Sequence, residues 1–182
     1  SYDVNKAVGG LREKIPAVLL RGPKDRYRIC WLVHDARMCG GMKYIADIVN
    51  EMNELGVNAK VAVIKRKEDG PEEWLGELTC APVFFKSREE FIKEFPTRVF
   101  PGGVLVASTV ELSPLVKMVS EMSNGRIRPL LHVQSYEPEL VVDPRDQVTA
   151  RQLFKTLPEI VSNANWVSTR VEEDSHFKPF AT

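Results

Sequence analysis

The sequence predicts an α/β domain in which a mainly parallel sheet of about six strands lies between two layers of helices. Short apolar runs alternate with amphipathic segments over residues 27–182, and this alternation is typical of strands joined by crossover helices. The runs are apolar throughout rather than at every second position, which indicates strands buried on both faces. Residues 1–26 lack this pattern and are interrupted by glycine and proline, so we interpret them as an N-terminal extension.

The clearest unit opens the domain. An apolar run at 29–33 is followed by the pair Gly40-Gly41 and by an amphipathic helix expected at 42–55, which Gly56 should end. With a second strand at 61–64 these segments make a βαβ unit, whose crossover should be right-handed. The apolar face of the helix comprises Met42, Ile45, Ala46, Val49, Met52 and Leu55.

The alternation continues to the end of the chain. Ser87 is placed to cap a helix that Pro96 would stop, and Ser113-Pro114 to open another helix. The elements expected after the second strand are a short helix at 71–75, a strand at 82–85, helix 87–95, strand 103–107, helix 113–122, strand 130–133, helix 149–157, strand 159–161 and helix 166–173.

Composition excludes several classes of protein. Lysine plus arginine number 25 and aspartate plus glutamate also 25, so no overall field attracts nucleic acid or an anionic membrane. The three cysteines form neither a disulfide framework nor a CxxC pair, which favours a reducing, cytoplasmic location. No stretch approaches the ~20 apolar residues of a membrane helix. The histidines lack metal-ligand spacing, and a solvated helix start explains the aspartates of 143–146, so we expect no metal site.

Ligands of open parallel sheets bind beyond the C-terminal ends of the strands, which here selects the loops 34–41, 65–70, 108–113 and 134–146. The first of these loops holds His34 and the glycines Gly40 and Gly41 at a helix start, where free N–H groups and the helix dipole favour an anion. A plain tight turn explains the same glycines, and both interpretations stay open.

The two later loops carry groups suited to hydroxyl-rich ligands. Ser108, Thr109 and Glu111 follow the fourth strand, where they either contact a sugar or turn the chain. Gln134, Tyr136 and Glu137 follow the fifth strand and supply hydrogen-bonding groups and an aromatic face. Glu137 is also the one weak candidate for a catalytic base. The structural alternative is that Glu137 pairs with Arg145 and fixes the loop. His132, inside the fifth strand, is expected to be a core residue.

Several motifs, in this order, resemble family 4 glycosyltransferases, and most closely the branch that builds rhamnose-containing and other bacterial surface polysaccharides. The likeness extends from about residue 28 to about 178. The motifs are Trp31-Leu32-Val33, Gly40-Gly41-Met42-Lys43, Leu55-Gly56, Val104-Leu105-Val106-Ala107-Ser108-Thr109, Pro114-Leu115-Val116, Gln134-Ser135-Tyr136-Glu137-Pro138 and Ile160-Val161-Ser162-Asn163-Ala164-Asn165-Trp166.

The resemblance implies a GT-B fold, in which two Rossmann-like domains face one another. It implies metal-independent sugar transfer from a nucleotide sugar to a glycan or other hydroxyl acceptor, usually with retention and without a cofactor. This chain would be the N-terminal, acceptor-side domain, with Gly40, Gly41 and Met42 approaching the donor diphosphate. The C-terminal donor-binding domain is absent from the sequence, so we expect the isolated domain to be inactive. Peripheral association with the inner face of the membrane is a further expectation.

Two other classes of function share this pattern. One is a Rossmann-like nucleotide-binding module of the dehydrogenase type. The three-glycine fingerprint is missing, however, and Lys65-Arg66-Lys67 stand where an acidic residue should follow the second strand. The other is an interaction module without catalysis, because a fold alone does not define a reaction.

Overall fold

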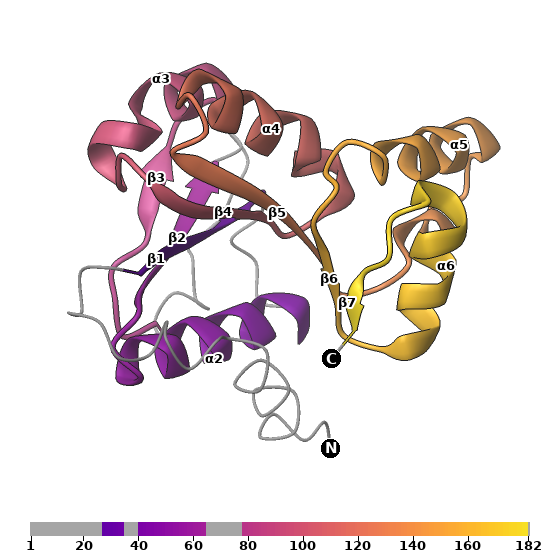
Figure 1. Cartoon of the computed structure of the whole chain (residues 1–182), viewed down its shortest axis with the longest axis horizontal. Coiled ribbons are helices and arrows are strands. Elements are labelled where there is room, and N and C mark those ends of the chain that lie inside the picture. Colours follow the sequence, from indigo (N-terminus) through magenta and orange to yellow (C-terminus); the bar gives the residue numbers. More distant parts are fainter. Residues whose placement is uncertain (1–26, 35–39, 65–77, 182) are drawn as a thin grey trace.

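The computed structural model describes residues 27–34, 40–64 and 78–181. Seven strands form one sheet in the order β3-β2-β1-β4-β5-β6-β7, and every pair of neighbours is parallel (Figure 1). The predicted α/β class with a parallel sheet is therefore confirmed. The strands are β1 (Arg28–Val33), β2 (Asn58–Ile64), β3 (Val83–Phe85), β4 (Gly103–Ala107), β5 (Ile127–Val133), β6 (Ile160–Ser162) and β7 (Phe180–Ala181).

The strand order reverses at β1, which lies in the middle of the sheet. β1 pairs with β2 on one side, Trp31 opposite Val61, and with β4 on the other side, Trp31 opposite Val106. The chain thus winds outward in one direction from β1 to β3 and in the other from β4 to β7. In open parallel sheets, ligands bind at the C-terminal edge beside such a reversal of strand order.

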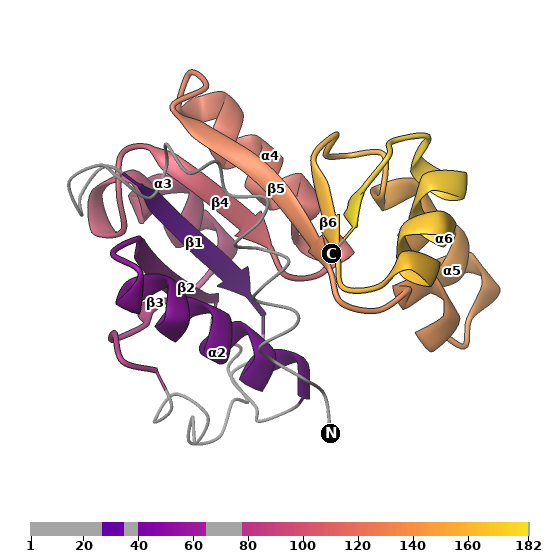
Figure 2. The same cartoon turned by 60° about the horizontal axis from the view of Figure 1, so that its bottom comes forward.

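Helix α2 (Gly40–Glu54) covers one face of the sheet (Figures 1 and 2). Its Ile45 and Val49 are fully buried, as the apolar stripe predicts. From the sheet, Trp31 and Val33 point to this helix, whereas Cys30 and Leu32 join the core of the opposite face. Successive residues of β1 therefore serve two cores, which explains its uninterrupted apolar sequence.

The other face carries α3 (Arg88–Arg98) and α4 (Ser113–Met122), and the same core extends to α5 (Pro144–Leu153) and α6 (Asn165–Ser175) beside β6 and β7 (Figure 1). Phe91 and Phe95 of α3 are fully buried, and the Phe91 ring lies edge-on to Phe85 at 5.1 Å. Helices on both faces give the three-layer α/β/α arrangement that the sequence predicts. None of the helices in the described part is long and apolar enough to cross a bilayer.

Local capping rules hold at several helix ends. Ser87 precedes α3, and its hydroxyl accepts from the Glu90 N–H at 3.1 Å. Asp143 caps α5 by accepting from the Arg145 N–H at 2.8 Å. Gly56 has φ +85°, a left-handed conformation that glycine adopts without strain, and it follows α2 as predicted.

Other boundaries differ from the sequence prediction. Pro96 does not stop α3, which continues to Arg98, because the Val99 N–H still bonds the Phe95 carbonyl at 2.9 Å. Helix α5 begins at Pro144 rather than 149, since the Asp143 cap starts it, and it ends at Leu153. The two-residue strand β7 was not predicted. The expected helix at 71–75, the loop 65–70 and the extension 1–26 lie outside the described residues.

Candidate functional site at the C-terminal edge of the sheet

Because all strands are parallel, their C-terminal ends lie along one edge of the sheet (Figure 2). The Ser108 N–H, directly after β4, donates to the Leu32 carbonyl of β1 at 3.2 Å. The candidate site is thus placed at the ends of β1 and β4, with the end of β5 next to β4. The residues that the sequence singles out lie in the loops that leave these three strands.

The first turn of α2 is one wall of the site. Gly40, Gly41 and Met42 form this turn, and the N–H groups of a first helical turn have no acceptor inside the helix. The Gln134 side chain, from the loop after β5, packs directly on Gly41. A Cβ at position 41 would lie 2.8 Å from Gln134 Oε1, closer than such atoms approach. Gly41 therefore permits the close approach of the first turn of α2 and the loop after β5, although Gly41 and Gln134 are 93 positions apart in the sequence.

The Met42 side chain does not line this turn. It packs in the core between α2 and the sheet, where 9% of its surface stays exposed. Of the three residues expected to approach a diphosphate, Met42 can therefore offer only its backbone N–H group.

The loop after β4 connects to the end of β1 through side chains. His34 Nε2 lies 3.7 Å from Glu111 Oε2, and the Glu111 side chain is two-thirds exposed while His34 is largely covered. The Thr109 Oγ1 atom is buried and has no hydrogen-bond partner among the described residues. A buried hydroxyl without a partner is costly, and a bound ligand or water at this edge would satisfy it.

Glu137 joins the loops after β4 and β5. Both of its carboxylate oxygens accept from the Val110 N–H, at 3.0 Å each. Burial raises the pKa of Glu137 to about 7 even though the Val110 bond favours the carboxylate, and the neighbouring Glu111 charge raises it further. A carboxyl group with a pKa near neutrality can accept or release a proton under physiological conditions, which is the property of an acid–base group.

Of the two interpretations of Glu137 made from the sequence, the structural one has a different partner. No ion pair with Arg145 occurs within the described part of the chain, and the partner that fixes Glu137 is the Val110 backbone. The contact positions the short 3₁₀ turn η2 (Val110–Leu112) and leaves the carboxyl at the site. Glu137 thus has a structural contact and a perturbed pKa at once.

Tyr136 does not offer its ring to a ligand. Only 4% of its surface is exposed, its ring stacks on Phe154 with centroids 5.9 Å apart, and its hydroxyl donates to Asp174 Oδ2. Burial and the Asp174 bond raise the pKa of Tyr136 to about 12. The expectation that this tyrosine faces a sugar is wrong. The side chain turns inward because the loop enters the 3₁₀ turn η3 (Glu137–Leu140), whose Pro138 is also buried.

His132 is a satisfied core residue, as predicted. The Trp31 Nε1–H donates to His132 Nδ1 at 3.3 Å, so the proton of the neutral ring is on Nε2, which lies 2.8 Å from Asn163 Oδ1. Burial lowers the pKa of His132, which keeps the ring neutral. This chain of contacts ties β1, β5 and the end of β6 together. Asn163 was missed because the loop after β6 was not among the four selected, although the strand-end rule applies to it equally.

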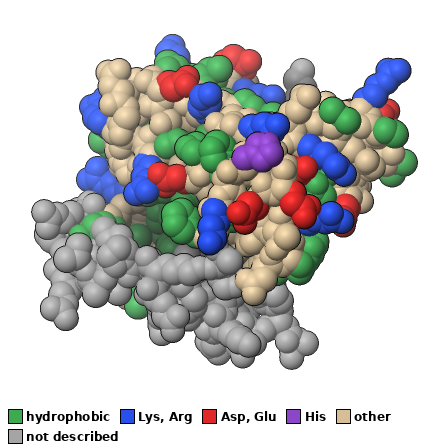
Figure 3. Space-filling view, turned by 45° about the vertical axis from the view of Figure 1, so that its right-hand side comes forward, with side chains coloured by type: hydrophobic (Ala, Val, Ile, Leu, Met, Phe, Trp, Pro, Cys, Tyr) green, Lys and Arg blue, Asp and Glu red, His purple; other side chains and the backbone are tan. Residues whose placement is uncertain are grey.

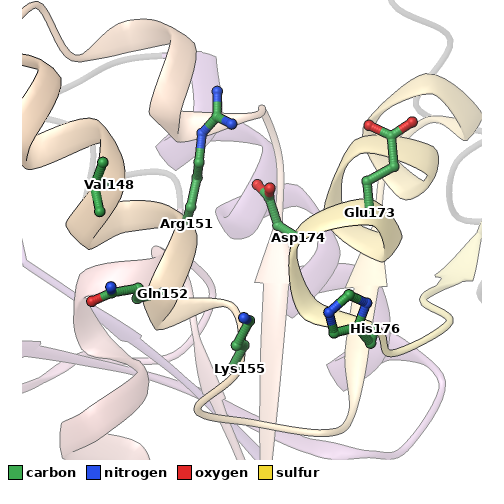
Figure 4. Close-up of a pocket in the computed structure, with 7 residues that line it drawn as sticks. All are labelled: Val148, Arg151, Gln152, Lys155, Glu173, Asp174 and His176. Carbon is green, nitrogen blue, oxygen red and sulfur yellow. The ribbon is translucent and has the colours of Figure 1, made fainter.

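A pocket lies between α5 and α6 (Figure 4). Side chains from both helices point into it, and they carry charges of both signs. Asp174 on its wall already accepts from Tyr136. None of the strand-end residues predicted from the sequence lines this pocket, so the pocket and the predicted chemistry are in different places. We place the candidate site at the strand ends, where polar groups from separate loops converge. The pocket is lined by Val148, Arg151, Gln152, Lys155, Glu173, Asp174 and His176.

Within residues 27–34, 40–64 and 78–181, no group of three His, Cys, Asp or Glu side chains is arranged to hold a metal ion. The polar groups of the strand-end site are instead a helix N-terminus, an amide, a hydroxyl and two carboxylates. All of these groups can hydrogen-bond to hydroxyls, and the helix N–H groups, the amide and the hydroxyl can donate to a phosphate.

Several solved structures have the same fold. HepE from Anabaena in complex with UDP-glucose matches with a TM-score of 0.61 at 13% identity, over 85% of this chain and 43% of HepE. HepE in complex with UDP and glucose matches with a TM-score of 0.62 at 14% identity, over 86% and 44%. WaaB, a lipopolysaccharide outer core galactosyltransferase in its apo form, matches with a TM-score of 0.56 at 11% identity, over 81% and 42%.

These likenesses establish the fold, because the identities are low. The chain spans less than half of the length of HepE and of WaaB. No protein-family model matches the sequence, and no curated protein matches it either. The chain therefore has the Rossmann-like fold of one half of larger proteins, of which one binds UDP-glucose and another is a galactosyltransferase.

Proposed function

We propose that this chain is the acceptor-side domain of a glycosyltransferase that moves a sugar from a nucleotide sugar to a hydroxyl of a glycan. The observation that carries the proposal is the convergence at one sheet edge of Gly41, Gln134 and Glu137, residues that the sequence motifs singled out. The likeness to HepE in complex with UDP-glucose supports it. A second, donor-binding domain would complete the cleft, in agreement with the share of HepE and WaaB that the chain covers.

Each part of the candidate site would have one task. The first turn of α2 faces the donor diphosphate, whose negative charge the helix N-terminus and its N–H groups stabilise. Gln134, with Thr109 and Glu111, hydrogen-bonds the hydroxyls of the acceptor, and His34 lies beside Glu111. No metal ion or cofactor is required in this scheme, because the helix N-terminus supplies the positive field.

Glu137 would accept a hydrogen bond from the acceptor hydroxyl that attacks the sugar. The carboxylate form is the acceptor, so the second-order rate constant for acceptor use should rise with pH through about 7, the pKa of Glu137. Retention of configuration, which the motif resemblance implies, corresponds to Glu137 orienting the hydroxyl. Inversion corresponds to Glu137 removing the proton during attack from the opposite face. Product stereochemistry separates these two roles.

The wider setting follows from the same resemblance. We place the enzyme in the family 4 branch that builds bacterial surface polysaccharides. Such acceptors grow at a membrane, so we propose a cytoplasmic protein with peripheral attachment to its inner face. The chain has a formal net charge of zero, so it provides no overall field that would attract nucleic acid.

The test is a transferase assay on the full product of the reading frame and on the 182-residue chain. Both are incubated with UDP-, GDP- and dTDP-sugars and a panel of oligosaccharide acceptors. Turnover is expected only where a donor-binding domain is present. Turnover of ~1–1000 per second by the chain alone would refute the two-domain scheme. Absence of transfer by the full product with every donor would favour an interaction module or another nucleotide-binding function.

A matched pair of variants then tests the site. Glu137→Gln should weaken acceptor use and remove its pH dependence. Glu139→Gln, two positions away on the same turn, should not, because Glu139 is exposed and pairs with Arg170 at 3.6 Å. If Glu137→Gln lowers only the melting temperature and leaves acceptor kinetics alone, Glu137 is structural and the acceptor lies elsewhere.

A further inference from the structure

Two large aromatic side chains are exposed in the described part of the chain, Trp166 and Phe180. Trp166 leaves 57% of its surface open, which is costly for so large an apolar group unless something covers it. Phe180 belongs to β7 at the side of the sheet, whereas Trp166 lies in the first turn of α6, directly after the C-terminal end of β6. Trp166 is therefore at the same sheet edge as the candidate site.

The position of Trp166 is fixed by buried contacts beneath it. Val167 and Val171 of α6 are fully buried in the main core, and the Ser168 hydroxyl bonds that of Ser162 at the end of β6. Asn163, three residues before Trp166, accepts from His132 through its amide oxygen. Because the inner face of α6 is held in this way, the indole is presented outward from a rigid base. A rigid aromatic surface loses little entropy when a ligand stacks on it.

The loop after β5 brings the candidate site next to this part of α6. Arg170 lies one helical turn after Trp166 and forms an ion pair with Glu139 of η3 at 3.6 Å. Glu139 is two residues from Glu137. Trp166 and Glu137 are thus carried by α6 and η3, two elements that an ion pair joins.

Two asparagines lie close to Trp166 in the chain, at the end of β6 and the start of α6. The Asn163 amide uses its oxygen for His132, and no described residue accepts from its two N–H donors. Asn165, beside Trp166, is exposed. An aromatic face next to amide donors matches a pyranose ring, whose axial C–H groups form an apolar face and whose hydroxyls point outward at the rim.

The charges nearby oppose the other common partner of an exposed tryptophan, an anionic membrane surface. Glu139, Glu172 and Glu173 are exposed on the elements around Arg170. Figure 3, in which the right-hand side of Figure 1 comes forward, shows acidic and basic side chains intermixed rather than a uniformly basic surface. An anionic surface attracts clusters of lysine and arginine, which this mixed face does not provide.

We propose that Trp166 is a stacking platform for a sugar unit of the acceptor glycan, beyond the unit that receives the transferred sugar. This subsite rests on the proposed transferase function for its role, but sugar binding at Trp166 can be measured without any transfer. Trp166 thus takes the role of the aromatic platform that the sequence suggested for Tyr136, because the fold buries Tyr136.

The test uses saturation-transfer NMR on the 182-residue chain with methyl glycosides and disaccharides of glucose, galactose, mannose and rhamnose. At least one probe should bind. Trp166→Ala should weaken it about tenfold, the usual loss when a stacked ring is removed, and Trp166→Phe should retain most of the binding. Phe180→Ala is the matched control for an exposed aromatic residue and should have no effect. Melting temperatures of all variants verify that each is folded.

Four outcomes separate the explanations. Sugar binding that requires Trp166 supports the platform, even if the full product shows no transfer and the proposed function fails. Transfer by the full product with an acceptor Michaelis constant unaffected by Trp166→Ala overturns the platform and leaves the function intact. No binding of any probe overturns it as well. Trp166-dependent binding to vesicles of anionic phospholipid, without sugar binding, would replace it with a membrane contact.

Discussion

Replacing Glu137 with glutamine should change how the stability of the fold depends on pH. Burial raises the pKa of Glu137 from 4.5 to about 7. Between these two values the folded chain keeps a proton that the unfolded chain has released. The stabilisation from this proton is complete below pH 4.5 and is lost as the pH rises through about 7. Each tenfold change in proton affinity corresponds to about 1.4 kcal/mol, so the full loss is about 3 kcal/mol.

Glutamine has the same shape and no proton to lose, so Glu137→Gln should not show this loss. The free energy of unfolding of the variant, relative to the unsubstituted chain, should therefore increase by about 3 kcal/mol between pH 4.5 and about 8.5. For a domain of this size that difference is about 6–12 °C in melting temperature. Groups that titrate in both proteins cancel in the comparison.

The assay is urea denaturation followed by circular dichroism at several pH values in that range. Glu139→Gln is the matched control, because Glu139 is exposed, and its difference from the unsubstituted chain should stay constant. A difference for Glu137→Gln that stays within about 0.5 kcal/mol at all pH values would mean that Glu137 is ionised in the fold at neutral pH. The reasoning that makes it an acid–base group at the site would then be refuted.

Substitutions at three other positions test separate parts of the structure. Gly41→Val places side-chain atoms where the Gln134 amide lies, so in the full product it should lower transferase activity strongly while the melting temperature of the chain changes little; preserved activity would reduce Gly41 to a turn residue. His132→Ala leaves the Trp31 and Asn163 groups without their partner and opens a cavity, so it should lower the free energy of unfolding by about 3–5 kcal/mol in denaturant. A loss below about 1 kcal/mol would contradict the hydrogen bonds from Trp31 to His132 and from His132 to Asn163. Burial lowers the pKa of His132 from its ordinary value of 6.5, so the stability that the neutral ring provides should be complete above pH 6.5 and be lost as the pH falls below 6.5. A comparison with His132→Gln over that pH range would detect the loss. Tyr136→Phe removes the bond to Asp174 and should destabilise the chain by about 1 kcal/mol without changing sugar binding; weaker sugar binding would restore Tyr136 to the site.

The sequence predicted the parts of this fold that depend on local patterns. The apolar stripe of α2 and the glycine that follows it define one βαβ unit, and continuous apolar strands predict a sheet covered on both faces. The helix and strand boundaries that were wrongly predicted lie where the local sequence signals are weak or favour different ends. Pro96 removes one donor, but α3 continues to Arg98, because the Val99 N–H still bonds the Phe95 carbonyl at 2.9 Å. β7 has only two residues, too few for any periodicity.

The sequence selects candidate residues by their position at strand ends and says less about their orientation. The strand-end rule selects Gly41, Gln134 and Glu137 without any knowledge of their contacts, and the fold brings them to one edge. The rule says nothing about the direction of a side chain within a loop. Tyr136 turns inward to Phe154, and Trp166 at the next strand end turns outward, although both are aromatic residues close to a strand end. That difference arises from packing between distant segments, which no local pattern contains.

The most direct test of the account is to map ligand contacts on the 182-residue chain by amide NMR, with UDP-glucose and the oligosaccharide panel as probes. The account predicts that the oligosaccharides shift the amide signals of Thr109, Gln134 and Glu137. UDP-glucose should shift those of the first turn of α2, starting at Gly41. Oligosaccharide shifts confined to the α5–α6 pocket, at Arg151, Gln152 and Lys155, would contradict the placement of the acceptor at the C-terminal edge of the sheet.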